Sequence, residues 1–241
     1  REHLCVGMRA YGVDWNGGFA EAMVAAAGTI YRLPEGASPR AGCLTEPLAC
    51  ALHGMDRLGV QSGSTVLVQG AGLLGLMLIR LARLAGAAFV AASEPHEARR
   101  ADARAFGADA VADPGSEGWR EALVAATPGE GFDNVIDAVG SAATLEAAVS
   151  LAARGGRILV FGVAPPAEVS RIRPNEIFSR ELTIVGSLVN PYTHERAVNL
   201  LGQMMPDRLR LAAFPLARFR EAFEAQASGA AATKVLLLPQ E

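Results

Sequence analysis

Apolar and polar positions alternate with two different periods along the central part of the chain. Between residues 65 and 186, short apolar runs are separated by longer stretches in which apolar residues recur at helical spacing. We expect strands at Thr65–Gln69, Ala88–Ser93, Ala110–Ala112, Asn134–Ala138, Arg157–Phe161 and Leu182–Val185, and helices at Leu73–Ala85, Glu97–Phe106, Gly118–Ala126 and Ser141–Ala153. This alternation predicts an α/β fold, in which a six-stranded, doubly wound parallel sheet of the nucleotide-binding (Rossmann) type is covered by helices on both faces.

The N-terminal part follows a different pattern. Trp15–Glu21 bends at two glycines, and Ala22–Ala26 and Thr29–Leu33 have the composition of short strands, so we expect a small β element there. Residues 40–58 predict a helix, in which Pro47 is tolerable only in the first turn or at a break.

The C-terminal part also departs from the central alternation. His194–Met204 and Leu216–Ala227 predict two helices, and Lys234–Leu238 predicts a closing strand. The chain therefore divides into an α/β centre and two flanks of another architecture.

The strongest local signal is Gln69-Gly-Ala-Gly-Leu-Leu-Gly75, where an apolar strand ends and an apolar helix is expected to begin. Gly70 permits a tight turn out of the strand, Gly72 lets a pyrophosphate approach the backbone, and Gly75 lets helix and strand pack closely. The phosphates would lie on the N–H groups that begin the helix. Strand, turn and helix together favour dinucleotide binding over an ordinary glycine turn.

Glu94 follows the second predicted strand and lies 19 residues after Gly75 (94 − 75). This is the usual distance for the acid that holds an adenosine ribose, although a surface glutamate would look the same. A carboxylate accepts hydrogen bonds from ribose hydroxyls and repels a 2′-phosphate, so NAD is preferred to NADP. Arg99 and Arg100 weaken this preference, because arginines here could bind a phosphate. We assign no role to His3, His96 or His194.

Composition excludes several classes of function. The net charge of the 241 residues is −3 and no basic face is evident, which argues against nucleic acid or an anionic membrane as a partner. The apolar stretch 66–79 is too short to span a bilayer. Three cysteines and no signal peptide lead us to expect a protein of the reducing cytoplasm.

Several motifs in this order resemble the medium-chain dehydrogenase/reductase superfamily, and within it the zinc-dependent polyol, threonine and butanediol dehydrogenases. The motifs are Asn16-Gly-Gly-Phe-Ala-Glu21, Leu33-Pro-Glu-Gly36, Glu46-Pro-Leu-Ala-Cys-Ala-Leu-His53, Gly70-Ala-Gly-Leu-Leu-Gly75, Phe106-Gly-Ala-Asp109, Asp133 to Gly140, Gly155-Gly-Arg157 and Leu182-Thr-Ile-Val-Gly-Ser187. The resemblance implies a GroES-like catalytic domain contributed by residues 1–47 and 189–241, with the NAD-binding domain at residues 48–188.

The resemblance also implies a catalytic zinc, whose cysteine and histidine ligands would precede Arg1, so we expect the N-terminal part of the protein to be missing. Glu46 would lie at this zinc, as a ligand or holding its water, although a carboxylate that begins a helix is the structural alternative. Cys5 would be the last of four cysteines of a structural zinc lobe, and one cysteine cannot build such a site.

Further cofactor contacts are implied at the ends of the other strands. Leu73 and Leu74 follow the glycine turn, and Leu74 would support the nicotinamide. The remaining candidates are Arg99 beside the adenosine, Val139, Gly162, Val163, Ser187 and Val189.

Together these residues predict an oxidoreductase, a zinc-dependent and NAD-linked dehydrogenase of a secondary alcohol such as a polyol or a hydroxy amino acid. The resemblance implies a homodimer or homotetramer joined along an edge strand. Two alternatives remain open at this point: a zinc-free, NADPH-dependent enone or quinone reductase of the same superfamily, and a dinucleotide-binding fragment without catalysis.

Overall fold

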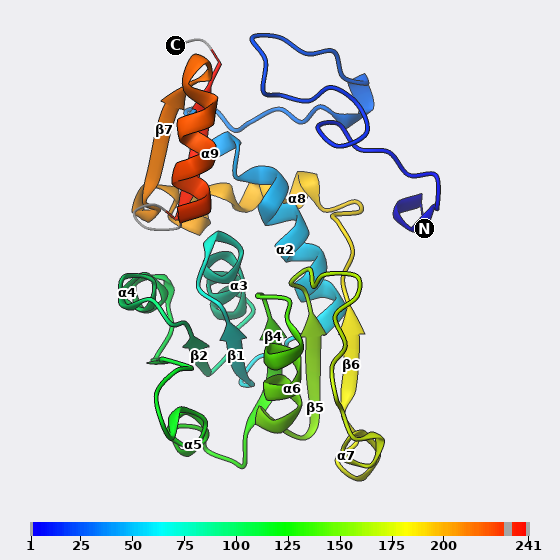
Figure 1. The fold of residues 1–241 in the computed structure, drawn as a ribbon, viewed down its shortest axis with the longest axis vertical. Coiled ribbons are helices and arrows are strands. Elements are labelled where there is room, and N and C mark those ends of the chain that lie inside the picture. Colours follow the sequence, from blue (N-terminus) through cyan, green and yellow to red (C-terminus); the bar gives the residue numbers. More distant parts are fainter. Residues whose placement is uncertain (1, 229–232, 240–241) are drawn as a thin grey trace. The chain divides into compact units, whose positions relative to one another are not determined.

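The computed structural model of the chain describes residues 2–228 and 233–239 (Figure 1). These residues form two compact units. Unit 1 comprises Arg1–Glu46 and Pro191–Glu241, and unit 2 comprises Pro47–Asn190.

Unit 2 contains a six-stranded parallel sheet of the order β3-β2-β1-β4-β5-β6. The strands are β1 (Thr65–Gln69), β2 (Phe89–Ser93), β3 (Ala110–Ala112), β4 (Phe132–Asp137), β5 (Ala152–Val160) and β6 (Thr183–Gly186). The order reverses between β1 and β4, which is the switch point of a doubly wound nucleotide-binding sheet. The predicted α/β fold class is confirmed.

Helices cover both faces of this sheet, as Figure 1 shows. Successive residues of a strand point to opposite faces, and Val68 and Leu67 of β1 illustrate this. Val68 faces α3 (Leu73–Leu84), whereas Leu67 belongs to the core that contains Ala147 and Ala148 of α6 (Ala142–Leu151). Every residue of β1 is buried, as expected for a strand covered on both sides.

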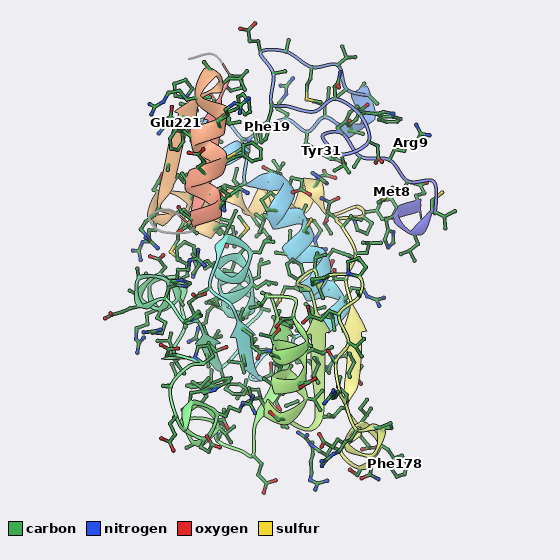
Figure 2. All side chains as sticks on the ribbon, viewed as in Figure 1. Met8, Arg9, Phe19, Tyr31, Phe178 and Glu221 are labelled. Carbon is green, nitrogen blue, oxygen red and sulfur yellow. The ribbon has the colours of Figure 1, made fainter. Side chains whose placement is uncertain are left out.

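The remaining helices of unit 2 follow or flank the strands. They are α4 (Glu97–Phe106), α5 (Trp119–Ala125), α7 (Pro174–Ser179) and most of α2 (Thr45–Leu58). Phe178 of α7 is 81% exposed, and Figure 2 shows its side chain at the outer side of that helix. No helix among the described residues is both long and apolar enough to cross a membrane.

Unit 1 contains a parallel two-stranded sheet of β7 (Leu211–Pro215) and β8 (Lys234–Leu238), connected through α9 (Phe219–Ser228). It also contains α1 (Pro39–Gly42), α8 (His194–Leu200) and short 3₁₀ helices at Glu2–Leu4, Ala27–Thr29, Leu201–Met204, Pro206–Arg208 and Leu216–Arg218. Phe19, labelled in Figure 2, contacts Phe223 of α9 edge to face at 6.0 Å between ring centroids.

The strands expected at Ala22–Ala26 and Thr29–Leu33 are wrong. The described residues of this stretch form a 3₁₀ turn at Ala27–Thr29 and otherwise belong to no helix or strand. Ala26 and Ile30 are extended, with φ,ψ of −63°, 133° and −103°, 125°, so the local preference is correct. A strand also needs a partner in hydrogen-bonding register, and no described segment of this chain provides one.

Several expected boundaries also differ, and the largest shift among the strands is that of β5, which begins at Ala152 instead of Arg157. The helix expected over 40–58 is broken at Cys43 and Leu44, and Pro47 lies in the first turn of α2, where its missing N–H is harmless. The helix expected to end at Ala153 ends at Leu151, because β5 begins at Ala152.

Candidate functional site

A cavity of about 520 Å³ lies in unit 2 at the carboxyl ends of β1, β2 and β4. Gln69 and Ser93 are the last residues of β1 and β2, and Ala138 follows β4 directly. The full lining is Gln69, Gly70, Gly72, Ser93, Glu94, Pro95, His96, Arg99, Pro114, Trp119, Arg120, Ala138, Val139, Ala143, Thr144 and Ala147. The cavity therefore occupies the place where open parallel sheets bind their ligands.

Each of the three glycines in the turn after β1 has a different structural reason to lack a side chain, or none within the chain. Gly70 has φ +91°, and a Cβ there would lie 2.8 Å from Val139 Cγ2. A Cβ on Gly75 would lie 2.0 Å from the Gly70 carbonyl oxygen, so only glycine allows α3 to pack this closely against the turn. A Cβ on Gly72 would meet no described atom within 4 Å. Packing inside the chain therefore explains Gly70 and Gly75 but leaves Gly72 unexplained.

Gly72 is the N-cap of α3 and lines the cavity. It provides no side chain to accept hydrogen bonds from the first turn of the helix, where the N–H groups have no intrahelical partner. An anion bound at this position would accept those hydrogen bonds and would be favoured by the helix dipole.

Glu94 is only 3% exposed, and neighbouring groups hold both of its carboxylate oxygens. Oε2 accepts a hydrogen bond from the Ala71 N–H at 2.9 Å. Oε1 accepts one from the His96 backbone N–H at 3.1 Å and lies 2.7 Å from His96 Nδ1. Burial alone would raise the pKa of Glu94, but these hydrogen bonds, with the charge of Arg99, outweigh it and lower that pKa below its ordinary value. The cavity wall therefore carries an ionised carboxylate at neutral pH.

The turn after β4 is fixed by Asp137, whose side chain is buried. Its Oδ1 accepts hydrogen bonds from the N–H groups of Val139 and Gly140, both at 3.0 Å. Gly140 has φ +82°, and a Cβ on Gly162 would lie 2.2 Å from the Gly140 nitrogen. The strand-end turns after β4 and β5 are therefore in direct backbone contact.

The cavity brings together five of the residues predicted for the cofactor. These five are Gly70, Gly72, Glu94, Arg99 and Val139. Leu73, Leu74 and Gly75 lie in the first turn of α3, directly after the Gly72 N-cap, and do not line the cavity.

The candidates after β5 and β6 do not line this cavity. Val163 is 92% exposed and follows Gly162, whose backbone lies against that of Gly140. The hydroxyl oxygen of Ser187 is buried and has no hydrogen-bond partner among the described residues, and Val189 has a φ of +50°. A branched residue in the left-handed region is strained, which is more frequent at functional sites than elsewhere. The roles of these residues stay predictions.

Neither metal candidate lies in a group that could hold zinc. Within residues 2–228 and 233–239, no three His, Cys, Asp or Glu side chains are grouped as a metal site would require. Cys5 is exposed, and Glu46 is exposed in the first turn of α2. The described residues therefore do not form a zinc site by themselves.

Sequence reasoning missed several cavity residues. His96 lines the cavity, but its only sequence signal is its position two residues after the predicted acid. Gln69 and Ser93 could have been found as the last residues of their strands. Trp119 and Arg120 had no local signal, because only the sheet topology brings the start of α5 to the cavity.

Comparison with known proteins agrees with this geometry. Residues 74–203 match the family described as zinc-binding dehydrogenase. The chain is 40% identical over 191 residues to a D-altritol 5-dehydrogenase of Agrobacterium fabrum, covering 77% of this chain and 54% of that protein. It is 35% identical over 184 residues to an L-threonine 3-dehydrogenase of Pyrococcus abyssi, covering 76% of this chain and 52% of that one. The matches thus span about half the length of these curated relatives.

Among solved structures, one described as a zinc-binding dehydrogenase of Sinorhizobium meliloti 1021 bound to NADP has a TM-score of 0.90 and 37% identity. The match covers 98% of this chain and 70% of that one. The chain therefore belongs to the zinc-binding dehydrogenase family of the medium-chain dehydrogenase/reductase superfamily.

Proposed function

We propose that this chain forms the cofactor-binding part of an NAD-linked dehydrogenase that oxidises a secondary alcohol, of the polyol or hydroxy amino acid type. The observation that carries the proposal is the glycine at position 72. It faces a cavity at the switch point of the sheet, and packing within the chain gives no reason for its lack of a side chain. The names of the polyol and threonine dehydrogenases among the relatives support the substrate class.

The chain's own residues would bind the dinucleotide and orient it. The N–H groups at the start of α3 would hold the pyrophosphate, and Glu94 would accept a hydrogen bond from the adenosine ribose. When bound, NAD supplies the acceptor for a hydride from the substrate carbon. Contact between the turns that contain Gly140 and Gly162 would fix the ends of β4 and β5 beneath the nicotinamide half.

The proposed partner is a small alcohol, and the oligomer would form along β6, which lies at an edge of the sheet. The N–H and C=O groups of an edge strand are available for pairing with a second chain.

Glu46 would lie beside the family's catalytic zinc. The described residues do not form the site of that metal by themselves, so no step of the reaction is assigned to it.

The test is an oxidation assay on the natural full-length protein with NAD⁺ and a panel of altritol, arabinitol and threonine, followed by NADH absorbance. We expect NAD⁺-dependent oxidation of at least one of these alcohols and its loss after zinc is removed with a chelator. Activity that survives complete zinc removal, or NADPH-dependent reduction of enones without alcohol oxidation, would contradict the proposal.

A further inference from the structure

His96 lies at the edge of the cavity, directly beside the buried carboxylate of Glu94. Its Nδ1 is 2.7 Å from Glu94 Oε1, and its own backbone N–H donates to the same oxygen. The imidazole is 64% exposed, whereas the Glu94 side chain is 4% exposed. His96 therefore presents an accessible ring to the cavity while it contacts the group expected to hold the ribose.

The hydrogen-bonding capacity of Glu94 is largely used inside the chain. A carboxylate has about four lone-pair sites. Ala71 N–H, His96 N–H and the His96 ring occupy three positions on Glu94. Glu94 can then bind roughly one ribose hydroxyl. How strongly this site rejects a 2′-phosphate therefore depends on the charge of the groups around Glu94 as well as on Glu94 itself.

The titratable and charged groups in this part of unit 2 come from four elements. They are Glu94 at the end of β2, Glu97, Arg99 and Arg100 on α4, Asp113 after β3, and Arg120 on α5. Arg100 donates to the carbonyl oxygens of Glu94 and Pro95 and lies 3.3 Å from Asp113, so its charge is compensated locally.

Two of these cations line the cavity itself. Arg99 contributes to the lowered pKa of Glu94, and the Arg120 guanidinium lies 5.3 Å from the centre of the Trp119 ring. An anion in this cavity would thus meet one carboxylate, two guanidinium groups and an imidazole.

We propose that His96 sets how strongly this site discriminates against the 2′-phosphate of NADP, so that the preference for NAD weakens as the pH falls. The inference rests on the proposed dinucleotide-binding function. A neutral ring donates its Nδ1 proton to Glu94 and adds no charge, so the carboxylate repels a 2′-phosphate. A protonated ring keeps that hydrogen bond, compensates the carboxylate and gains a second N–H donor at Nε2.

The experiment measures dissociation constants of NADH and NADPH for the chain by fluorescence titration, at about pH 6 and about pH 8.5. The 2′-phosphate of NADPH itself titrates near pH 6. Comparing the wild type with His96→Gln removes this contribution, because the ligand titrates equally with both proteins. The quantity of interest is the Kd of NADH divided by the Kd of NADPH. On lowering the pH, we expect this ratio to rise about fivefold more in the wild type than in His96→Gln, the effect of one partly exposed ion pair.

His194→Gln is the matched control, because His194 stacks on Tyr31 in unit 1 and is not part of the cavity. It is expected to keep the wild-type dependence on pH, and His96→Asn is expected to lose it as His96→Gln does. If both dinucleotides bind and the ratio changes equally in the wild type and His96→Gln, the inference is overturned while the proposed function stands. If neither dinucleotide binds, the proposed function fails and the inference fails with it.

Discussion

Replacing Gly72 by alanine is expected to weaken NADH binding strongly without destabilising the fold. The residue has φ −70° and ψ −174°, which alanine adopts readily, and its new methyl group would meet no described atom within 4 Å. In the complex the methyl would occupy the place of the pyrophosphate. Overpacking of this kind costs about 1–3 kcal/mol, which is roughly a fivefold to 150-fold increase in Kd.

The measurement pairs NADH titration with urea unfolding, and Gly75→Ala provides the comparison. The free energy of unfolding of Gly72→Ala should match the wild type or exceed it by about 0.5 kcal/mol, because alanine restricts the unfolded chain. Gly75→Ala places a Cβ 2.0 Å from the Gly70 carbonyl oxygen and should lower that free energy by about 3 kcal/mol. Unchanged NADH affinity in Gly72→Ala would show that no phosphate approaches this backbone.

Gly162→Ala is expected to destabilise unit 2 by about 3 kcal/mol, because two backbone segments would have to separate. The added Cβ would lie 2.2 Å from the Gly140 nitrogen and 2.4 Å from the Val139 carbonyl carbon. Backbone cannot rotate aside as a flexible side chain can. Asp137 also holds the Gly140 turn through two hydrogen bonds, so the turn has little freedom to move.

Urea unfolding followed by circular dichroism measures this effect, with Gly186→Ala as the matched variant. Gly186 lies in β6 of the same sheet, and a Cβ there would meet no described atom within 4 Å. We expect Gly186→Ala to change the free energy of unfolding by less than about 1 kcal/mol. Equal effects of the two substitutions would mean that the contact between the turns after β4 and β5 does not support the sheet.

The central sheet could be predicted from sequence because its signals are local and strong. β1, β3 and α4 begin and end where their apolar patterns do. A strand buried on both faces must be continuously apolar, and a glycine turn must follow it if phosphate is to approach the backbone. These requirements are visible in single stretches of sequence.

The flanking parts were less predictable because their structure depends on distant partners. Residues 22–33 have strand-like composition but no partner strand among the described residues, so they form no strand. β7 was missed because its sequence, Leu-Ala-Ala-Phe-Pro, contains two alanines and a proline, which are depleted in strands. It becomes a strand by pairing with β8, which is far along the chain.

The site also combines residues with a local sequence signal and residues placed by distant contacts. Gly70, Gly72 and Glu94 could be identified because the strand ends place them on one edge of the sheet. The contribution of His96 depends on its 2.7 Å contact with Glu94, which the sequence does not specify. Arg120 reaches the cavity only because β3 pairs with β2, which brings the following helix alongside.

Hydrogen–deuterium exchange of the chain with and without NADH tests the central claim, dinucleotide binding at the switch point of the sheet, most directly. We predict slower amide exchange on addition of NADH in residues 70–76, 93–99 and 138–141, which include the glycine turn, Glu94 and the turn after β4. Unchanged exchange in these three segments at saturating NADH, or protection confined to unit 1, would contradict the claim.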